Sequence, residues 1–584
     1  MRKFLCAFVL VIASSAFAEI APVADRVAAQ NKLFDEFYEN NLKNSPEQAT
    51  SLGDYRYNDK LSQVSLADIA RRHTEADDFL KRLKAIPTDG MTDKDLLSHR
   101  LLERQLERED VNFELKNYEM PLSQQNGVHT RLADLPLSVP FDTVQQYKDY
   151  IARLRQIPRV LDQTAEVMRQ GLKDGLMPPK LVVEKLPGQC DGVVEANPFI
   201  LPTKKFPASF SDADKKQLTD DITKAINDDV IPAYKKFTEF LRKDYATKGR
   251  TELSVESLPD GKRRYAEAVK FMTTMNITPS EVHEIGLKEV ERITAEMTKL
   301  ATAQGHKDLA SFRKAIHDDP KWTPTSEQQI VDDFAKYINE MQPKLPELFG
   351  LLPKSPVTVE AIPGFAKAEA THYVSGTPDG KRPGRVVVAV ADPTKRSLVN
   401  DEAVAYHEGV PGHHMQISIA QTLPDLPKFR LRGFYSAYAE GWALYSEELG
   451  KEIGFYKDPV SDYGRLNSEL FRAVRLVVDT GIHDKGWTRE KVIEFMHQND
   501  VNDAVAQTET DRYIAWPGQA LAYKMGQLTI RKLRDKAKIE LGAKFDIKAF
   551  HDIILNGGAM PLDLLQERVE RWIKDQQTKT ASVP

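Results

Sequence analysis

The chain has 584 residues, of which 41% are hydrophobic and 29% charged, and its formal net charge is −5. These shares are typical of a soluble globular protein, and the lack of a basic block interleaved with aromatic residues argues against nucleic acid as a partner. Beyond the first residues no apolar run approaches the roughly 20 residues that span a bilayer, so we expect no stable membrane insertion of the mature chain.

The first 18 residues have the pattern of a secretory signal. Two cations precede an apolar run over residues 4–13, and Ala16 to Ala18 form a small-x-small cleavage pattern. An uncleaved anchor helix is the alternative, but this run is shorter than the roughly 20 residues that cross a bilayer. Cleavage after Ala18 places the mature chain across the inner membrane, in the periplasm.

The two cysteines leave core packing as the source of stability. Cys6 lacks the small residues before it that a lipid-attachment cysteine needs, and it departs with the signal. The mature chain then keeps Cys190 alone, which forbids an internal disulfide even in an oxidising compartment.

Residues from about 24 to 345 show apolar positions at the three-and-four spacing of amphipathic helices. In the segment 278–305, Ser280 is placed to cap the first turn, and the apolar positions form one stripe. These positions are Val282, Ile285, Val290, Ile293, Met297 and Leu300. The pattern predicts a mainly helical N-terminal region over residues 19–350.

Two short runs, 355–363 and 385–392, interrupt the helical pattern. Both are rich in β-branched residues, and the turn-rich stretch 375–384 lies between them. They predict a small β element, after which helical patterns return from about residue 399 to the end. We expect a catalytic region over residues 351–584, either separate from the N-terminal region or continuous with it as one domain.

The stretch AYHEGVPGHHMQ over residues 405–416 follows the β element and holds three of the chain's 13 histidines. On an unbroken helix His413 points roughly 120° away from His407, and His414 lies about 10.5 Å farther along the axis. Neither placement suits two bonds of about 2.0–2.1 Å to one zinc ion. Two imidazoles can share an ion here only if the helix is interrupted.

Pro411 supplies that interruption, because it has no N–H for the carbonyl of His407 and its ring clashes with that carbonyl. Gly409 and Gly412 add backbone freedom on either side. If the segment 409–412 loops out by two residues, His413 takes the position of the second ligand. His414 is the alternative second ligand.

A catalytic zinc site takes three protein ligands and keeps one position open. Glu440 lies on a small-residue face of the helical segment 435–450 and is a candidate third ligand. Glu447, two turns farther on, can ligate instead or support a ligand. The alternative is a purely structural role, in which these histidines are helix-end or core residues and Glu440 is a surface acid.

Five motifs resemble one known family. They are HEGVPGHHMQ, YSAYAEGWALYSEELG, FRAVRLVVDTGIHDKGW, ETDRYIAWPGQALAYKMGQ and FHDIILNGGAMPLDLL. Together they are similar to the bacterial family known as domain of unknown function 885, which is grouped with the zinc-dependent peptidases of the gluzincin type. The resemblance implies His407, His413 and Glu440 as zinc ligands and Glu408 as catalytic base, in a large helical zincin-like body with a deep cleft.

The implied activity is cleavage of peptide bonds in oligopeptides by a zinc-bound water from which Glu408 takes the proton. Further candidates for the catalytic step are Tyr513, Tyr523 and His483, and candidates for substrate binding are Arg512, Arg472 and Arg475. Two other functions remain open. One is a hydrolase of non-peptide amides or esters, and the other is a metal-stabilised periplasmic binding or chaperone-like protein without turnover.

Overall fold

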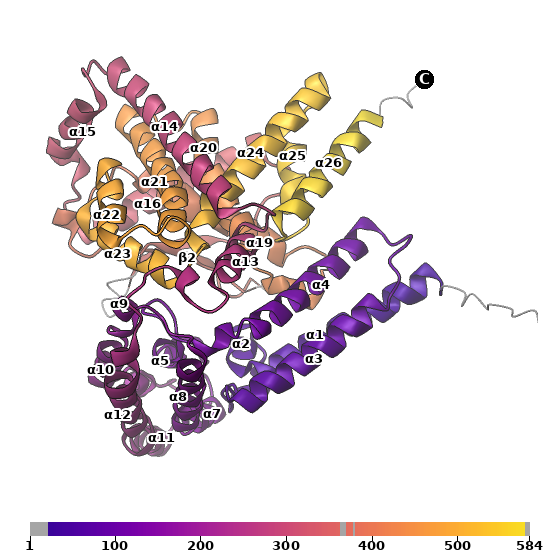
Figure 1. Ribbon diagram of the computed structural model, residues 1–584, viewed down its shortest axis with the longest axis vertical. Coiled ribbons are helices and arrows are strands. Elements are labelled where there is room, and N and C mark those ends of the chain that lie inside the picture. Colours follow the sequence, from indigo (N-terminus) through magenta and orange to yellow (C-terminus); the bar gives the residue numbers. More distant parts are fainter. Residues whose placement is uncertain (1–20, 363–369, 378–379, 425, 579–584) are drawn as a thin grey trace, which may run out of the picture.

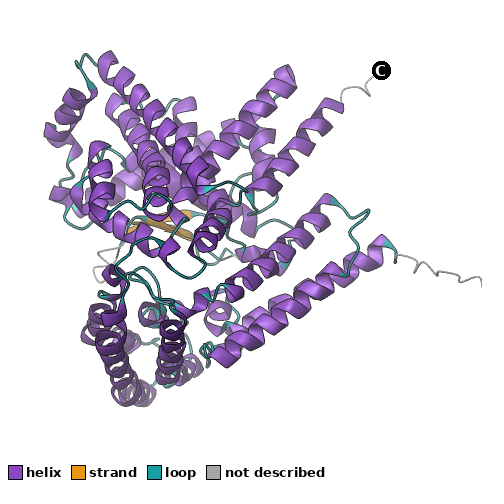
Figure 2. Ribbon diagram, in the orientation of Figure 1, coloured by secondary structure: helices purple, strands orange, loops and turns teal. Residues whose placement is uncertain are grey.

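The computed structural model of the protein describes residues 21–362, 370–377, 380–424 and 426–578. The predicted signal over residues 1–18 lies outside these ranges. Within them, every helix is too short or too polar to cross a bilayer. The fold is mainly α with one small sheet, as the sequence predicted (Figure 2).

The N-terminal part forms a helical layer followed by a bundle. The layer is α1, α3 and α4, whose apolar faces enclose one core, and the bundle around α8, α10, α11 and α12 encloses a second (Figure 1). Their helices are α1 (Val23–Asn44), α2 (Pro46–Ser51), α3 (Leu66–Lys84), α4 (Asp93–Glu114), α5 (Val128–Arg131), α6 (Leu135–Ser138), α7 (Val144–Leu154), α8 (Ile157–Asp174), α9 (Lys180–Val183), α10 (Leu186–Ala196), α11 (Asp212–Ala225) and α12 (Ile231–Phe240).

The largest core belongs to the helices from α14 onward, and α13 packs on them through a smaller core; all of them lie above the layer and the bundle in Figure 1. These helices are α13 (Gly261–Thr273), α14 (Pro279–Ala303), α15 (Leu309–Asp318), α16 (Glu327–Met341), α17 (Leu345–Leu348), α18 (Asp401–Glu408), α19 (His413–Gln421), α20 (Ser436–Glu452), α21 (Pro459–His483), α22 (Arg489–Gln498), α23 (Asp503–Ala515), α24 (Ala522–Leu541), α25 (Ile547–Leu555) and α26 (Leu562–Thr578). Helices on both sides of residue 350 therefore share one core.

The N-cap of helix α14 is Thr278, two residues before the predicted cap. Thr278 Oγ1 accepts from the N–H of Glu281 over 3.3 Å, and the Glu281 carboxylate accepts from the N–H of Thr278 over 2.9 Å. Pro279 occupies the first helical position, where a missing N–H costs nothing. Ser280, the predicted cap, instead donates to Asp484. The capping box succeeds because both of its side chains satisfy a main-chain donor.

The sheet has three strands in the order β1, β3, β2: β1 (Val357–Ala361), β2 (His372–Val374) and β3 (Gly384–Val388). β1 runs parallel to β3, and β2 runs antiparallel to it. β1 and β3 correspond to the two predicted runs. β2 was not predicted, because three residues are too few for an alternating pattern to be recognised.

Helices α20 and α24 cross with bare backbones in contact. A Cβ atom at Gly441 would lie 2.4 Å from the Cα atom of Gly526, and one at Gly526 would lie 1.9 Å from the carbonyl oxygen of Ala437. Only glycine fits at such a crossing. The crossing fixes the distance between the segment that carries Glu440 and the segment that carries Tyr523.

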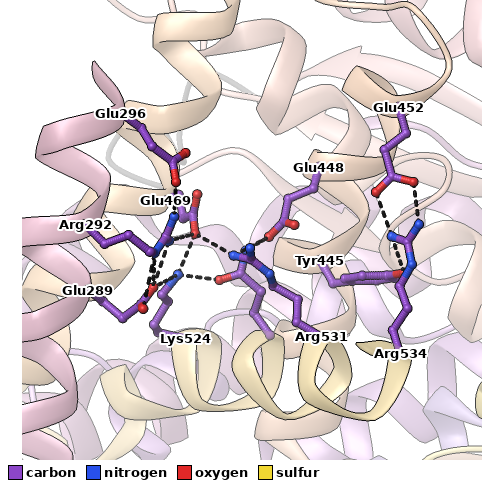
Figure 3. A network of polar contacts seen from close by, with 11 residues as sticks. Glu289, Arg292, Glu296, Tyr445, Glu448, Glu452, Glu469, Lys524, Arg531 and Arg534 are labelled. Carbon is purple, nitrogen blue, oxygen red and sulfur yellow. Dashed lines mark hydrogen bonds and ion pairs between the residues drawn. The ribbon is translucent and has the colours of Figure 1, made fainter. Parts of the chain in front are cut away.

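Buried charges join α14, α20, α21 and α24 beside this crossing (Figure 3). The side chain of Lys524 is fully buried, and its Nζ lies 2.6 Å from Glu469 Oε1 and 2.9 Å from Glu289 Oε2. Arg292 contacts the same Glu469 oxygen over 2.5 Å. Burial alone would raise the pKa of Glu469, but Lys524 and Arg292 hold it at about 2. Glu469 therefore stays charged at neutral pH.

Replacing Lys524 with methionine is expected to lower the free energy of unfolding by about 3 kcal/mol, because Glu469 and Glu289 lose the fully buried one of their two shared cations and keep Arg292. Chemical denaturation measures the change. The matched control is Lys536→Met on the same helix, whose ion pair with Glu570 is partly exposed and contributes about 1 kcal/mol or less. Equal losses in the two variants would contradict the assignment.

A cavity of about 370 Å³ opens between α1, α3 and α4, and its polar lining includes Asn41, Arg72 and Glu109. None of the predicted site residues lines it. The zincin-like arrangement and the deep cleft beside the histidine motif stay predictions.

Candidate functional site

The histidine motif is interrupted where the sequence predicted. Helix α18 ends at Glu408 and α19 begins at His413, with residues 409–412 between them. Trp442 on α20 holds this loop by donating its indole N–H to the carbonyl of Pro411 over 2.9 Å. A Cβ atom at Gly412 would lie 2.0 Å from the carbonyl oxygen of His407, so only glycine allows the chain to fold back so closely.

This loop brings His407 and His413 to one carboxylate. Their Nε2 atoms lie 3.4 Å and 3.3 Å from the same oxygen, Glu440 Oε2. The two imidazole rings meet at 90° with centroids 4.9 Å apart, and the three candidate ligand atoms all lie within 4.8 Å of one another. These three residues, His407, His413 and Glu440, are the candidate metal ligands, and we call the group the metal cluster.

The donor atoms of the metal cluster fit zinc. Bonds of about 2.0–2.1 Å in a tetrahedral site place neighbouring ligand atoms about 3.3–3.4 Å apart, and both nitrogen-to-oxygen distances match this value. Two imidazoles and one carboxylate are also the donor set of a zinc site that keeps one position open.

His407 is oriented from behind by Glu447, one of the two roles that the sequence left open for this residue. The Nδ1 atom of His407 lies 2.8 Å from Glu447 Oε1, and Arg472 Nη2 lies 3.8 Å from the same oxygen. A proton on Nδ1 leaves the Nε2 lone pair directed at the metal cluster. Burial alone would lower the pKa of His407, but Glu440 and Glu447 raise it to about 9. A metal ion that binds here therefore displaces a proton.

Glu447→Gln is expected to weaken zinc affinity by about 10- to 100-fold, because the amide keeps a hydrogen-bond acceptor but removes the charge that makes His407 a stronger ligand. Competition with a zinc chelator measures the affinity. Glu452→Gln on the same helix is the control, since its carboxylate pairs with Arg534 and contacts no member of the metal cluster. An unchanged affinity for Glu447→Gln would contradict its supporting role.

Glu408 follows His407 directly, at the end of α18. It is 9% exposed and accepts no hydrogen bond from any residue in the described ranges. A carboxylate without a partner, next to a metal ligand, is available to accept a proton from substrate or water.

His414, the alternative ligand, lies outside the metal cluster. Its Nδ1 atom is 3.1 Å from the hydroxyl of Tyr373 in β2, and its Nε2 atom is 3.0 Å from the carbonyl oxygen of Ser355. Burial lowers the pKa of His414 to about 4, so the ring is neutral. It joins α19 to the chain around the sheet, and the second imidazole of the cluster is that of His413.

The structure does not bring His483 to the metal cluster either. Its Nε2 atom donates to the carbonyl of Tyr513 over 3.0 Å, and its Nδ1 atom accepts from the N–H of Val255 over 3.1 Å. Burial lowers the pKa of His483 to about 4. Both ring nitrogens are thus occupied by main-chain groups, which leaves none for catalysis.

The two candidate tyrosines occupy different places. Tyr523 lies beside the metal cluster, with its ring nearly parallel to that of His407 and the centroids 6.5 Å apart. Tyr513 is 1% exposed, and its hydroxyl donates to Glu509 over 2.7 Å and accepts from Arg475 over 3.0 Å. Tyr523 therefore faces the metal cluster, whereas Tyr513 holds Arg475.

Of the three candidate arginines, one lies beside Glu447 and two lie beside Tyr523. Arg472 bonds to Ser468 and faces Glu447, so it serves the support of His407. Arg475 lies 4.6 Å from the ring centroid of Tyr523, and Arg512 donates to the Tyr523 hydroxyl over 3.4 Å.

Glu509 and Trp442 were not predicted. Glu509 pairs with Arg475 and Arg512 and accepts from Tyr513. Its spacing of three and four residues before Arg512 and Tyr513 is that of helix neighbours, a signal that could have identified it. Trp442 gives no such signal, because its partner is a main-chain carbonyl in a distant segment.

Residues 46–569 match the family described as a bacterial protein of unknown function (DUF885). A crystal structure of a candidate lipoprotein from Colwellia psychrerythraea superposes with a TM-score of 0.87 at 28% identity, covering 95% of this chain and 100% of that one. A candidate lipoprotein of unknown function from Shewanella oneidensis gives a TM-score of 0.72 at 19% identity, covers 92% of this chain and 99% of that one, and shows likeness of fold alone. No curated protein matches the chain.

Proposed function

Since the chain belongs to the bacterial DUF885 family, whose description assigns no activity, we propose a function from the site itself: a zinc-dependent hydrolase of the gluzincin type that cleaves peptide bonds in oligopeptides. One observation carries the proposal. Two imidazoles and a carboxylate converge at zinc-ligand spacing, with the unpartnered carboxylate of Glu408 next to them. A purely structural zinc site closes its fourth position with protein and needs no base.

His407, His413 and Glu440 would hold the zinc ion. Zinc would act as a Lewis acid, polarising a carbonyl and lowering the pKa of a water molecule from 15.7 toward about 7. Other divalent ions bind imidazole as well, but this donor set and spacing favour zinc.

Residues of the chain carry out the proton transfer, stabilise the developing negative charge and orient His407. Glu408 takes the proton from the attacking water and passes it to the leaving amine, since its carboxylate has no other partner. The hydroxyl of Tyr523 accepts from Arg512, which leaves its own hydrogen free to donate to the oxygen that becomes negative. Glu447 keeps the tautomer of His407 fixed throughout.

The proposed location is the cell envelope. The relative from Colwellia psychrerythraea is described as a candidate lipoprotein, and this chain begins with the pattern of an export signal. We propose the periplasm as the compartment.

Incubation with a mixed oligopeptide library, read by mass spectrometry, tests the proposal. We expect cleavage by the zinc-loaded protein, loss of cleavage after metal is stripped with a chelator, and recovery when zinc is added back. Metal analysis of the same samples supplies the occupancy. Bound zinc without cleavage of any peptide would overturn the hydrolase and favour the metal-stabilised binding protein, while cleavage of amides or esters other than peptides would correct the substrate class.

A further inference from the structure

Two arginines, Arg475 and Arg512, contact Tyr523 next to the metal cluster, and Glu509 pairs with both of them. Glu509 Oε2 lies 2.9 Å from Arg475 Nη2, and Glu509 Oε1 lies 3.3 Å from Arg512 Nη1. Burial alone would raise the pKa of Glu509, but the two arginines lower it to about 2. All three groups therefore stay charged at neutral pH, and the group carries one positive charge in excess.

Arg512 has hydrogen-bonding capacity to spare. Three of its five N–H groups donate, to Glu509, Gln519 and Tyr523. The other two, one of them on Nε, have no acceptor among the residues that the structure describes. The side chain of Arg512 is 20% exposed, whereas that of Arg475 is 7% exposed. Arg512 is thus the member of the pair that a ligand can reach.

Arg475, which is less exposed than Arg512, supplies a further unsatisfied donor. Its Nη1 atom is buried and has no partner within the described ranges. A buried charged donor without a partner is costly, and a ligand carboxylate is the group that best satisfies it, because guanidinium and carboxylate match in charge and in planar geometry. Arg472 also has a buried Nε atom without a partner in the described ranges, but its Nη1 donates to Ser468 and its Nη2 faces Glu447, so both ends of its guanidinium are already committed.

We propose that Arg512, backed by Arg475, binds the free C-terminal carboxylate of a peptide whose last peptide bond lies at the metal cluster. The substrates are then peptides with an unblocked C-terminus, cut one residue at a time from that end. This inference rests on the proposed hydrolase function.

The position of Arg512 agrees with this role. One extended residue spans about 3.3–3.6 Å, so an anchor for a terminal carboxylate must lie in the shell directly around the reacting carbonyl. Arg512 is one residue removed from the metal cluster, because it donates to the hydroxyl of Tyr523, whose ring faces that of His407. An enzyme that cuts inside long peptides would instead need this space for further residues of the chain.

The test compares two pools of N-acetylated tetrapeptides that differ only at the C-terminus, one with a free carboxylate and one amidated. For the zinc-loaded wild type we expect kcat/KM about 100-fold higher for the free-acid pool, with release of the last residue. Arg512→Met is expected to reduce this preference to about fivefold or less. Arg489→Met is the matched control, since Arg489 is similarly exposed and pairs with Asp511 on the same helix as Arg512.

A binding measurement separates recognition from turnover. The Glu408→Gln protein is incubated with both pools, and the peptides it retains on ultrafiltration are identified by mass spectrometry. Selective retention of free acids, lost on adding Arg512→Met, supports the anchor. Equal cleavage and retention of both pools, or an acid preference that survives Arg512→Met, overturns it while leaving the hydrolase proposal intact. Acid-selective retention without turnover by wild type overturns the hydrolase proposal but not the anchor, and neither cleavage nor retention of any peptide overturns both.

Discussion

Glu408→Gln protein is expected to keep a full complement of zinc while its kcat/KM for peptides falls by about 10³-fold. The amide has nearly the shape of the carboxylate but cannot accept a proton from water, and general base catalysis of this kind contributes about 10² to 10⁴ in rate. Glu408 lies at the end of α18 without a hydrogen bond to any residue in the part of the chain that the structure describes, so the substitution breaks no contact.

Metal analysis and peptide hydrolysis on the same preparation provide the two readouts. Glu360→Gln on β1 is the control, because Glu360 is partly exposed, pairs with Arg385 and contacts no member of the metal cluster. An activity of Glu408→Gln within about tenfold of wild type would show that another group takes the proton. Loss of zinc from this variant would instead place Glu408 among the ligands.

His413→Ala protein is expected to purify without stoichiometric zinc, whereas His414→Ala protein keeps it. Of these two histidines, His413 has its Nε2 atom at ligand spacing from Glu440, whereas both nitrogens of His414 are held by Tyr373 and Ser355. Removal of one of three protein ligands leaves two, too few for a catalytic zinc site.

Elemental analysis of the two purified variants decides between them. His414→Ala is also expected to lower the free energy of unfolding by about 1–3 kcal/mol, because it leaves the partners of a buried ring unsatisfied. Elemental analysis and thermal unfolding together therefore distinguish the two variants. We expect zinc loss for His413→Ala, and reduced stability with zinc retained for His414→Ala. The opposite pattern would exchange their roles.

Local chemistry made part of this site predictable from the sequence. Pro411 has no N–H and cannot continue a helix, so the end of α18 follows from one residue and its glycine neighbours. The same reasoning could not choose between His413 and His414, because that choice depends on how far the chain loops out. The loop is set by contacts from elsewhere, chiefly the hydrogen bond from Trp442 to Pro411.

The candidates that lie away from the metal cluster show the same limit. His483 and Tyr513 have side chains suited to catalysis, but main-chain groups around Val255 and Tyr513 occupy the histidine, and Glu509 with Arg475 occupies the tyrosine hydroxyl. Those partners come from segments that a single sequence does not place together. Helical periodicity predicted the mainly α fold because it is a property of each segment alone.

The bare crossing of Gly441 and Gly526 limits how this protein could be engineered. Even an alanine at position 441 would force its methyl group into the opposite backbone and push the two helices apart. Zinc coordination tolerates displacements of only about 0.2 Å, and Glu440 directly precedes Gly441, so we expect such a variant to lose zinc from the proposed site through geometry alone.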